Sequence, residues 1–161
     1  MRRWKALAGA TTLTLTAVLG TTAVGVEQGA AAAPPVEHCA VRVTGMDPDG
    51  HLRTTAPVCS SDQVRAQRSV MTASSDFPIG VHWDGPGLTG SSFTVVGSSC
   101  SGGWLNLNSL WINRVSSTQN FCRVIRHFDG YNLTGAAEDT FYPGANLGFL
   151  NNATNSIQYL P

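Results

Sequence analysis

The sequence predicts an all-β fold in two similar halves, preceded by a disulfide-stapled hairpin and one short helix. The chain is rich in Gly, Ser, Thr and Asn, and runs of Leu, Lys and Glu at helical spacing are missing, which favours strands over helices. An eight-residue phrase occurs twice, which is typical of an internal structural repeat. Four cysteines follow an export-type leader, and an even cysteine set is typical of small secreted domains.

The first 32 residues have the features of a secretory signal. A basic start, MRRWK, is followed by an uncharged stretch from residue 6 to residue 26 and by an Ala-rich cleavage region, and we expect cleavage after Ala32. The stretch is made of Ala, Thr and Gly rather than Leu, Ile and Phe, so we expect no stable membrane insertion once the signal is removed. The sequence therefore predicts a secreted, extracellular protein.

The remaining chain predicts one small domain with a near-neutral surface. Cleavage removes three of the ten basic residues and one of the ten acidic residues, which leaves a net charge of −2. Such a surface carries no basic stripe for a phosphate backbone, so we expect no nucleic-acid partner. We assign residues 33–77 to an N-terminal extension, residues 78–119 to a first motif and residues 120–160 to a second, in a domain that runs to residue 161, and we expect a monomer.

The cysteines are expected to form disulfides, for which three pairings are possible. Pairing between neighbours in sequence joins Cys39 to Cys59 and Cys100 to Cys122, and each bond closes a loop of about twenty residues. A zinc site is disfavoured because no two cysteines have C-x-x-C spacing.

The extension predicts a stapled hairpin and a helix. Alternating residues at 41–44 lead into the turn Asp-Pro-Asp-Gly at 47–50, and residues 51–55 run back. Ser61 and Asp62 can cap a helix over residues 63–71, a stretch that is free of Gly and Pro.

The repeat organises the rest of the chain. Residues 83–90 read WDGPGLTG and residues 128–135 read FDGYNLTG; each follows a strand and folds back over it. We expect two four-stranded units, with strands near 79–84, 92–96, 103–107, 115–119, 122–128, 137–142, 145–149 and 154–160.

This pattern resembles the Greek-key motif of the βγ-crystallin superfamily. The motif has an aromatic residue, a hydrophobic residue five positions later and a glycine two positions after that. These are Trp83, Leu88 and Gly90 in the first copy, and Phe128, Leu133 and Gly135 in the second. Ser117 and Ser156 close the two motifs. Glycine permits the folded-over hairpin, and we expect both leucines to plug the fold. Trp83, Trp104, Trp111 and Phe128 are expected to pack in the core.

The resemblance implies a possible calcium site in each motif. Many members bind calcium with a short Asn-, Asp- and Ser-rich segment, helped by a backbone carbonyl from the opposite motif's hairpin. The first set would be the Arg114 carbonyl and Ser116, with a carbonyl near Asp129. The second would be Asn151, the Ala153 carbonyl and Asn155, near Asp84. The alternative is that these polar groups only bind their own loop backbone. No cofactor is required.

The export signal, the stapled hairpin and the hairpin phrase are similar to a secreted actinobacterial branch of that superfamily. This branch is associated with peptidase inhibition, and a streptomycete metalloproteinase inhibitor is its archetype. The resemblance implies an extracellular peptidase as partner. Two loops would then bind it, and because they are rigid they would lose little entropy on binding. They consist of Gly85, Pro86, Gly87, Leu88 and Thr89, and of Tyr142, Pro143, Gly144, Ala145 and Asn146.

We do not expect an enzyme. Nothing brings a Ser-His-Asp set together, and no phosphate loop, H-E-x-x-H motif or paired-carboxylate signal occurs. His82 and His127 hold equivalent places in the repeat, but equivalent positions in a two-motif fold need not meet, so we do not expect a metal site there. Alternative readings of the function are a calcium-stabilised structural or stress protein and a small toxin of the same fold.

Overall fold

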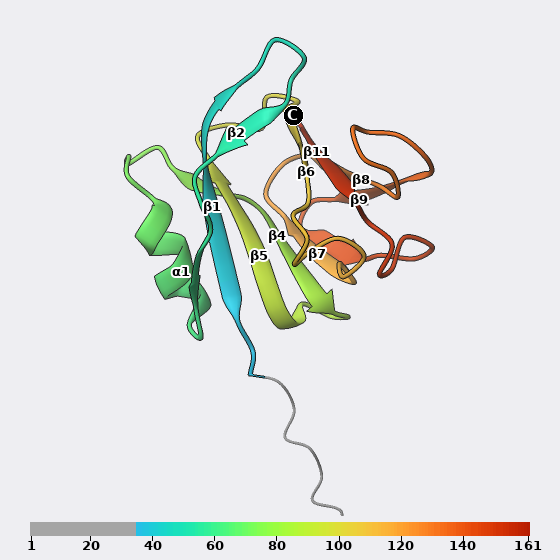
Figure 1. Cartoon of the computed structure of the whole chain (residues 1–161), viewed down its shortest axis with the longest axis horizontal. Helices are drawn as coiled ribbons and strands as arrows, with labels where there is room; N and C mark the ends of the chain where they lie inside the picture. The colour runs from blue at the N-terminus through green and yellow to red at the C-terminus, as the bar shows by residue number, and fades with distance from the viewer. Residues whose placement is uncertain (1–34) are drawn as a thin grey trace, which may run out of the picture. The chain divides into compact units, whose positions relative to one another are not determined.

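The structure is a computed structural model that describes residues 35–161. The expected signal at residues 1–32 lies outside the described residues. The described chain forms one compact unit of two sheets and one short helix (Figure 1). No helix among these residues has the length and apolar character needed to cross a membrane.

The strands form two sheets, and within each sheet the spatial order of the strands differs from their order in the sequence. The first sheet runs β10 (Gly144–Asn146), β7 (Ser117–Asn120), β4 (Phe77–Gly85), β5 (Thr89–Gly97), β1 (His38–Met46) and β2 (Leu52–Thr54), and β3 (Val58–Ser60) also pairs with β1. The second sheet runs β6 (Trp104–Asn106), β11 (Ser156–Leu160), β8 (Val124–Phe128) and β9 (Ala137–Phe141).

Each motif gives its third strand to the other motif's sheet. The first motif supplies β4, β5 and β7 to the first sheet, but its β6 pairs with β11 of the second motif. The second motif supplies β8, β9 and β11 to the second sheet, and its β10 pairs with β7 of the first. This reciprocal exchange makes the fold a βγ-crystallin-like sandwich of two Greek keys, as the sequence predicts.

The extension is continuous with the first sheet. Strand β1 pairs in parallel with β5, with Ala40 opposite Thr94, and the Cys39–Cys59 disulfide joins β1 to β3. The second disulfide joins Cys100 to Cys122, so both bonds follow the sequence-local pairing.

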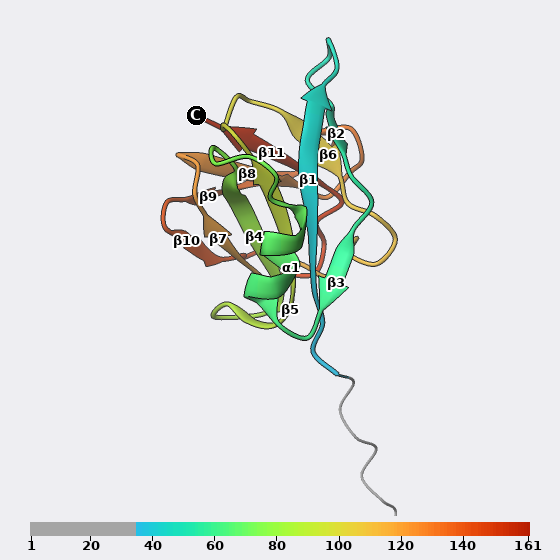
Figure 2. The same ribbon diagram turned by 90° about the vertical axis from the view of Figure 1, so that its left-hand side faces the viewer.

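The predicted helix is present as α1 (Gln63–Val70) and ends one residue earlier than expected. The carboxylate of Asp62 caps it by accepting a hydrogen bond of 3.0 Å from the Arg65 N–H. Ala66 and Val70 are buried on the strand side against Ala40 and Val96, and α1 lies along β1 (Figure 2).

The main core lies between the two sheets. It contains Ile79 and Val95 from the first sheet, Ile125 and Ile157 from the second, and Trp111 from the loop before β7. Each is at most 3% exposed. Full burial of such side chains contributes roughly 1.5–3 kcal/mol each to stability.

The expectation for the four large aromatic residues is right for two of them. Trp83 and Trp111 are buried. Trp104 and Phe128 are only partly buried, and the Trp104 indole packs edge-on against His51, with ring centroids 4.6 Å apart.

Candidate binding surface

The repeated phrase builds the same hairpin twice. In the first hairpin, Oδ1 of Asp84 accepts a hydrogen bond of 2.8 Å from the Ser91 N–H; in the second, Oδ1 of Asp129 accepts one of 2.7 Å from Ala136. Gly90 and Gly135 have φ angles of 81° and 85°. A Cβ at either glycine would collide with the aspartate carboxylate. The Asp and the Gly of the phrase are therefore required together.

A serine from the last strand of each motif fastens the hairpin. The Ser117 hydroxyl donates to the Gly85 carbonyl at 2.7 Å and accepts from the Leu88 N–H at 3.0 Å. Ser156 makes the equivalent contacts with Gly130 and Leu133, at 2.6 and 3.1 Å.

The leucines do not plug the fold as expected. Leu88 is 38% exposed, Leu133 is only partly buried, and both have positive φ angles, of 61° and 59°. The hairpin is held by backbone and serine hydrogen bonds, so the leucine side chain stays at the surface.

The two loops expected to face a partner lie side by side. The Gly87 N–H donates to Oδ1 of Asn146 at 2.6 Å. A groove of about 350 Å³ runs between them, and its lining includes Leu88, Pro143 and Gly144. We call residues 85–89 and 142–146 together the paired-loop surface.

This surface carries no charged residue, and exposed aromatic and apolar side chains lie on it beside the exposed Thr89 and Asn146. Tyr142 is 69% exposed, and its neighbour Phe141 is 61% exposed. One loop contains β10, the last strand of the first sheet, and β10 pairs only with β7. Fixed loops with exposed aromatic side chains suit docking on another protein.

The residues proposed for calcium come together in different pairs from those expected. The Ser116 hydroxyl lies 2.9 Å from the carbonyl oxygen of Asp84, in its own motif, and 3.0 Å from Oδ1 of Asn152 in the other. Asn155 contacts the carbonyl oxygen of Asp129, again in its own motif. The sequence argument paired Ser116 with Asp129 and Asn155 with Asp84, and it overlooked Asn152.

These donor sets are poor for calcium, which takes six to eight oxygens and favours carboxylates. The Asp84 carboxylate is bound by the Arg114 guanidinium at 2.6 Å, so a positive charge lies next to the three oxygens around Ser116. At the other site the Asn155 side chain presents its Nδ2 to the Asp129 carbonyl. Asn151 is exposed and Ala153 partly buried. The residues offer about three neutral oxygens and do not form a complete calcium site.

The two repeat histidines lie next to each other in the interior. His82 and His127 are fully buried, with ring centroids 5.6 Å apart. Thr118 Oγ1 lies 3.0 Å from His82 Nδ1 and 3.3 Å from His127 Nε2, and the Tyr159 hydroxyl lies 2.9 Å from His82 Nε2. Their shared place in the repeat was the signal that would have found them, because it puts them on the equivalent strands β4 and β8, one in each of the two sheets.

Burial keeps both histidines neutral. It lowers the pKa of His127 to about 3, against a small opposing effect of Asp139. It also lowers the pKa of His82 well below its usual range, with a further contribution from His127. Burial raises the pKa of the Tyr159 hydroxyl. Both histidine side chains are therefore enclosed in the core and hydrogen-bonded there in their neutral form.

Comparison with known proteins adds one structure. No family model matches this chain, and no curated protein matches it. The crystal structure of the N-terminal domain of protein S is similar to it, with 18% sequence identity over 49% of this chain and 91% of that domain, and a TM-score of 0.41. We assign the fold from the strand exchange alone.

Proposed function

We propose that this protein is a secreted, non-catalytic binding protein that inhibits an extracellular peptidase by docking its paired-loop surface on it. The observation that carries the proposal is the pairing of two fixed, uncharged loops from different motifs around one groove. The resemblance of the hairpin phrase to the inhibitor branch of the βγ-crystallins supplies the class of partner.

Preorganisation supports this role. The first loop is held by Ser117 and by the Asn146 amide, and the second contains β10, which is paired to β7. Loops that are already ordered lose little entropy on docking, which favours affinity. Tyr142 and Leu88 are the exposed anchors, because aromatic and aliphatic side chains that fill a partner's pocket dominate interface energies.

The experiment mixes the mature chain with a panel of metallo-, serine and cysteine peptidases and titrates residual activity. We expect stoichiometric inhibition of at least one class. The variant Tyr142→Ala should weaken inhibition by about tenfold or more, as expected for loss of an interface anchor.

The matched control is Tyr131→Ala. Tyr131 is 48% exposed and lies in the equivalent hairpin of the second motif, outside the paired-loop surface. Its variant should inhibit like the unchanged chain. A panel without any loss of activity, or equal effects of the two variants, would contradict the proposal.

A second candidate is a structural protein that calcium stabilises weakly. The observation that favours this candidate is that the Asp84 carbonyl oxygen and the Asn152 amide oxygen both lie within hydrogen-bond distance of the Ser116 hydroxyl. Three neutral oxygens beside an arginine favour a dissociation constant of millimolar order, at the weak end of extracellular calcium modules.

A further inference from the structure

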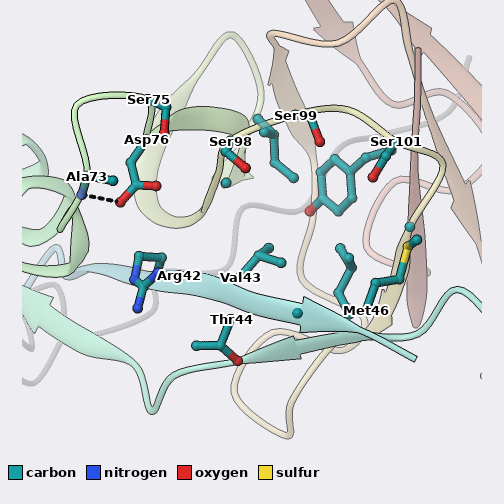
Figure 3. Close-up of a pocket in the computed structure, with 16 residues that line it drawn as sticks. Arg42, Val43, Thr44, Met46, Ala73, Ser75, Asp76, Ser98, Ser99 and Ser101 are labelled. Atoms are coloured by element: carbon teal, nitrogen blue, oxygen red, sulfur yellow. Dashed lines mark hydrogen bonds between the residues drawn. The ribbon is translucent and has the colours of Figure 1, made fainter. Parts of the chain in front are cut away.

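A cleft of about 430 Å³ lies between β1, the loop at residues 72–76 and the loop at residues 98–103 (Figure 3). It shares no residue with the paired-loop surface. Its volume falls in the range of small-molecule sites.

Arg42 brings a positive charge to this cleft. Among the described residues, its Nε atom is buried without a hydrogen-bond partner, and its guanidinium forms no ion pair. A buried donor without a partner calls for an explanation, because it costs roughly 1–3 kcal/mol. Since solvent does not reach the Nε, a ligand carboxylate would bind the terminal amino groups of the guanidinium, which offer parallel N–H donors to two oxygens.

Asp76 brings a negative charge to the same cleft. Its Oδ2 accepts hydrogen bonds from the Thr72 and Ala73 N–H groups, at 2.8 and 3.0 Å. These bonds, with a smaller contribution from Arg42, lower the pKa of the Asp76 carboxyl and keep it ionised. In Figure 3 the Asp76 side chain points toward the strand that carries Arg42. No nitrogen of Arg42 lies within 4.0 Å of the carboxylate oxygens, so the two charges flank a gap.

The rest of the cleft is apolar below and hydroxyl-rich at the rim. Its lining includes Ile79 and Tyr159. Met46, which is 46% exposed, lies at one end. The rim carries four serine hydroxyls, those of Ser75, Ser98, Ser99 and Ser101. A bound apolar group would cover Met46.

The walls of the cleft are fixed before any ligand arrives. The loop above β1 is anchored by the Cys100–Cys122 disulfide and by backbone hydrogen bonds of Gly102 and Gly103 with Tyr159, at 2.8 and 2.9 Å. The Asp76 loop is held by its own backbone contacts. Binding would therefore cost little ordering.

We propose that this cleft binds a small zwitterion with an apolar side chain, of the amino-acid or dipeptide class. Its carboxylate would bind Arg42, its ammonium group would bind Asp76, and its side chain would pack over Met46. The separated pair of opposite charges favours such a ligand over a simple anion, which Asp76 would repel.

The test is calorimetric titration of the mature chain with L-leucine, N-acetyl-L-leucine and L-leucinamide. Leucine should bind with a dissociation constant of about 1 mM or tighter. The acetylated compound lacks the ammonium charge and the amide lacks the carboxylate, so each should bind at least about tenfold more weakly.

The variant Arg42→Gln should weaken leucine binding by about tenfold or more. It should not lower the melting temperature, because the Arg42 guanidinium forms no ion pair among the described residues and the substitution removes a buried donor without a partner. Arg123→Gln, at an exposed arginine outside the cleft, is the matched control and should bind like the unchanged chain. Absence of leucine binding, equal binding of leucine and its acetylated form, or an unchanged affinity in Arg42→Gln would each overturn the proposal.

Discussion

Acidification should destabilise this protein well above the pH at which carboxylates titrate. The cause is the buried histidine pair. His127 has a pKa of about 3 in the folded chain against an ordinary value of 6.5. As the pH falls, a histidine with a lowered folded-state pKa takes up its proton in the unfolded chain first. The folded state therefore keeps its full stability above pH 6.5 and loses stability as the pH falls below that value.

The magnitude follows from that difference. Each pH unit below 6.5 favours the unfolded state by about 1.4 kcal/mol until the folded pKa is reached, so His127 alone costs about 2 kcal/mol at pH 5. His82 adds a loss in the same direction. Asp139 does not contribute in this window, because its lowered pKa, caused by Arg126, affects stability only below the ordinary value of 3.8.

The assay is urea unfolding of the disulfide-intact mature chain at pH 7.5, 6 and 5, followed by tryptophan fluorescence. His127→Gln should lower stability at pH 7.5 but flatten the dependence between pH 7.5 and 5. His51→Gln, at a partly exposed histidine, should leave the slope unchanged. A free energy of unfolding that stays within about 0.5 kcal/mol from pH 7.5 to 5 would refute the assignment of the pair as buried and neutral.

Three other perturbations test the hairpins, the second disulfide and the calcium candidate. Gly135→Ala should lower the free energy of unfolding by about 1–3 kcal/mol, because its Cβ meets the Asp129 carboxylate and its φ is positive; thermal melting measures it, and an unchanged midpoint would argue against the strained hairpin. Replacing Cys100 and Cys122 by serine should cost about 3 kcal/mol in urea unfolding, and a loss below about 1 kcal/mol would contradict the expected value. Calcium at about 10 mM should raise the melting temperature slightly relative to chelator, as linkage requires for weak binding, and identical midpoints would remove the second candidate function.

The repeat made most of the domain predictable. Two copies of one phrase mark two hairpins at Gly90 and Gly135, and strand alternation then places the eight strands of the two motifs within a few residues of their observed bounds. The helix was predictable for a local reason, since Asp62 caps a stretch free of Gly and Pro.

Features that depend on contacts between distant segments were not predictable in this way. The parallel pairing of β1 with β5 leaves no periodic signal, because strand alternation is the same in parallel and antiparallel ladders. The meeting of His82 and His127 and the grouping of Ser116 with Asn152 depend on how one motif faces the other. The Arg42 cleft joins three segments that share no motif.

The exchange of β6 and β10 between the motifs has a consequence for when the chain can fold. Neither four-stranded unit is complete within its own half of the chain, because β6 pairs with β11 and β10 pairs with β7. In a chain that is synthesised from its N-terminus, the first sheet therefore cannot be completed before residues 144–146 are available, and the second sheet cannot be completed before β11 is available. Completion of the two-sheet sandwich would then be a late event in folding.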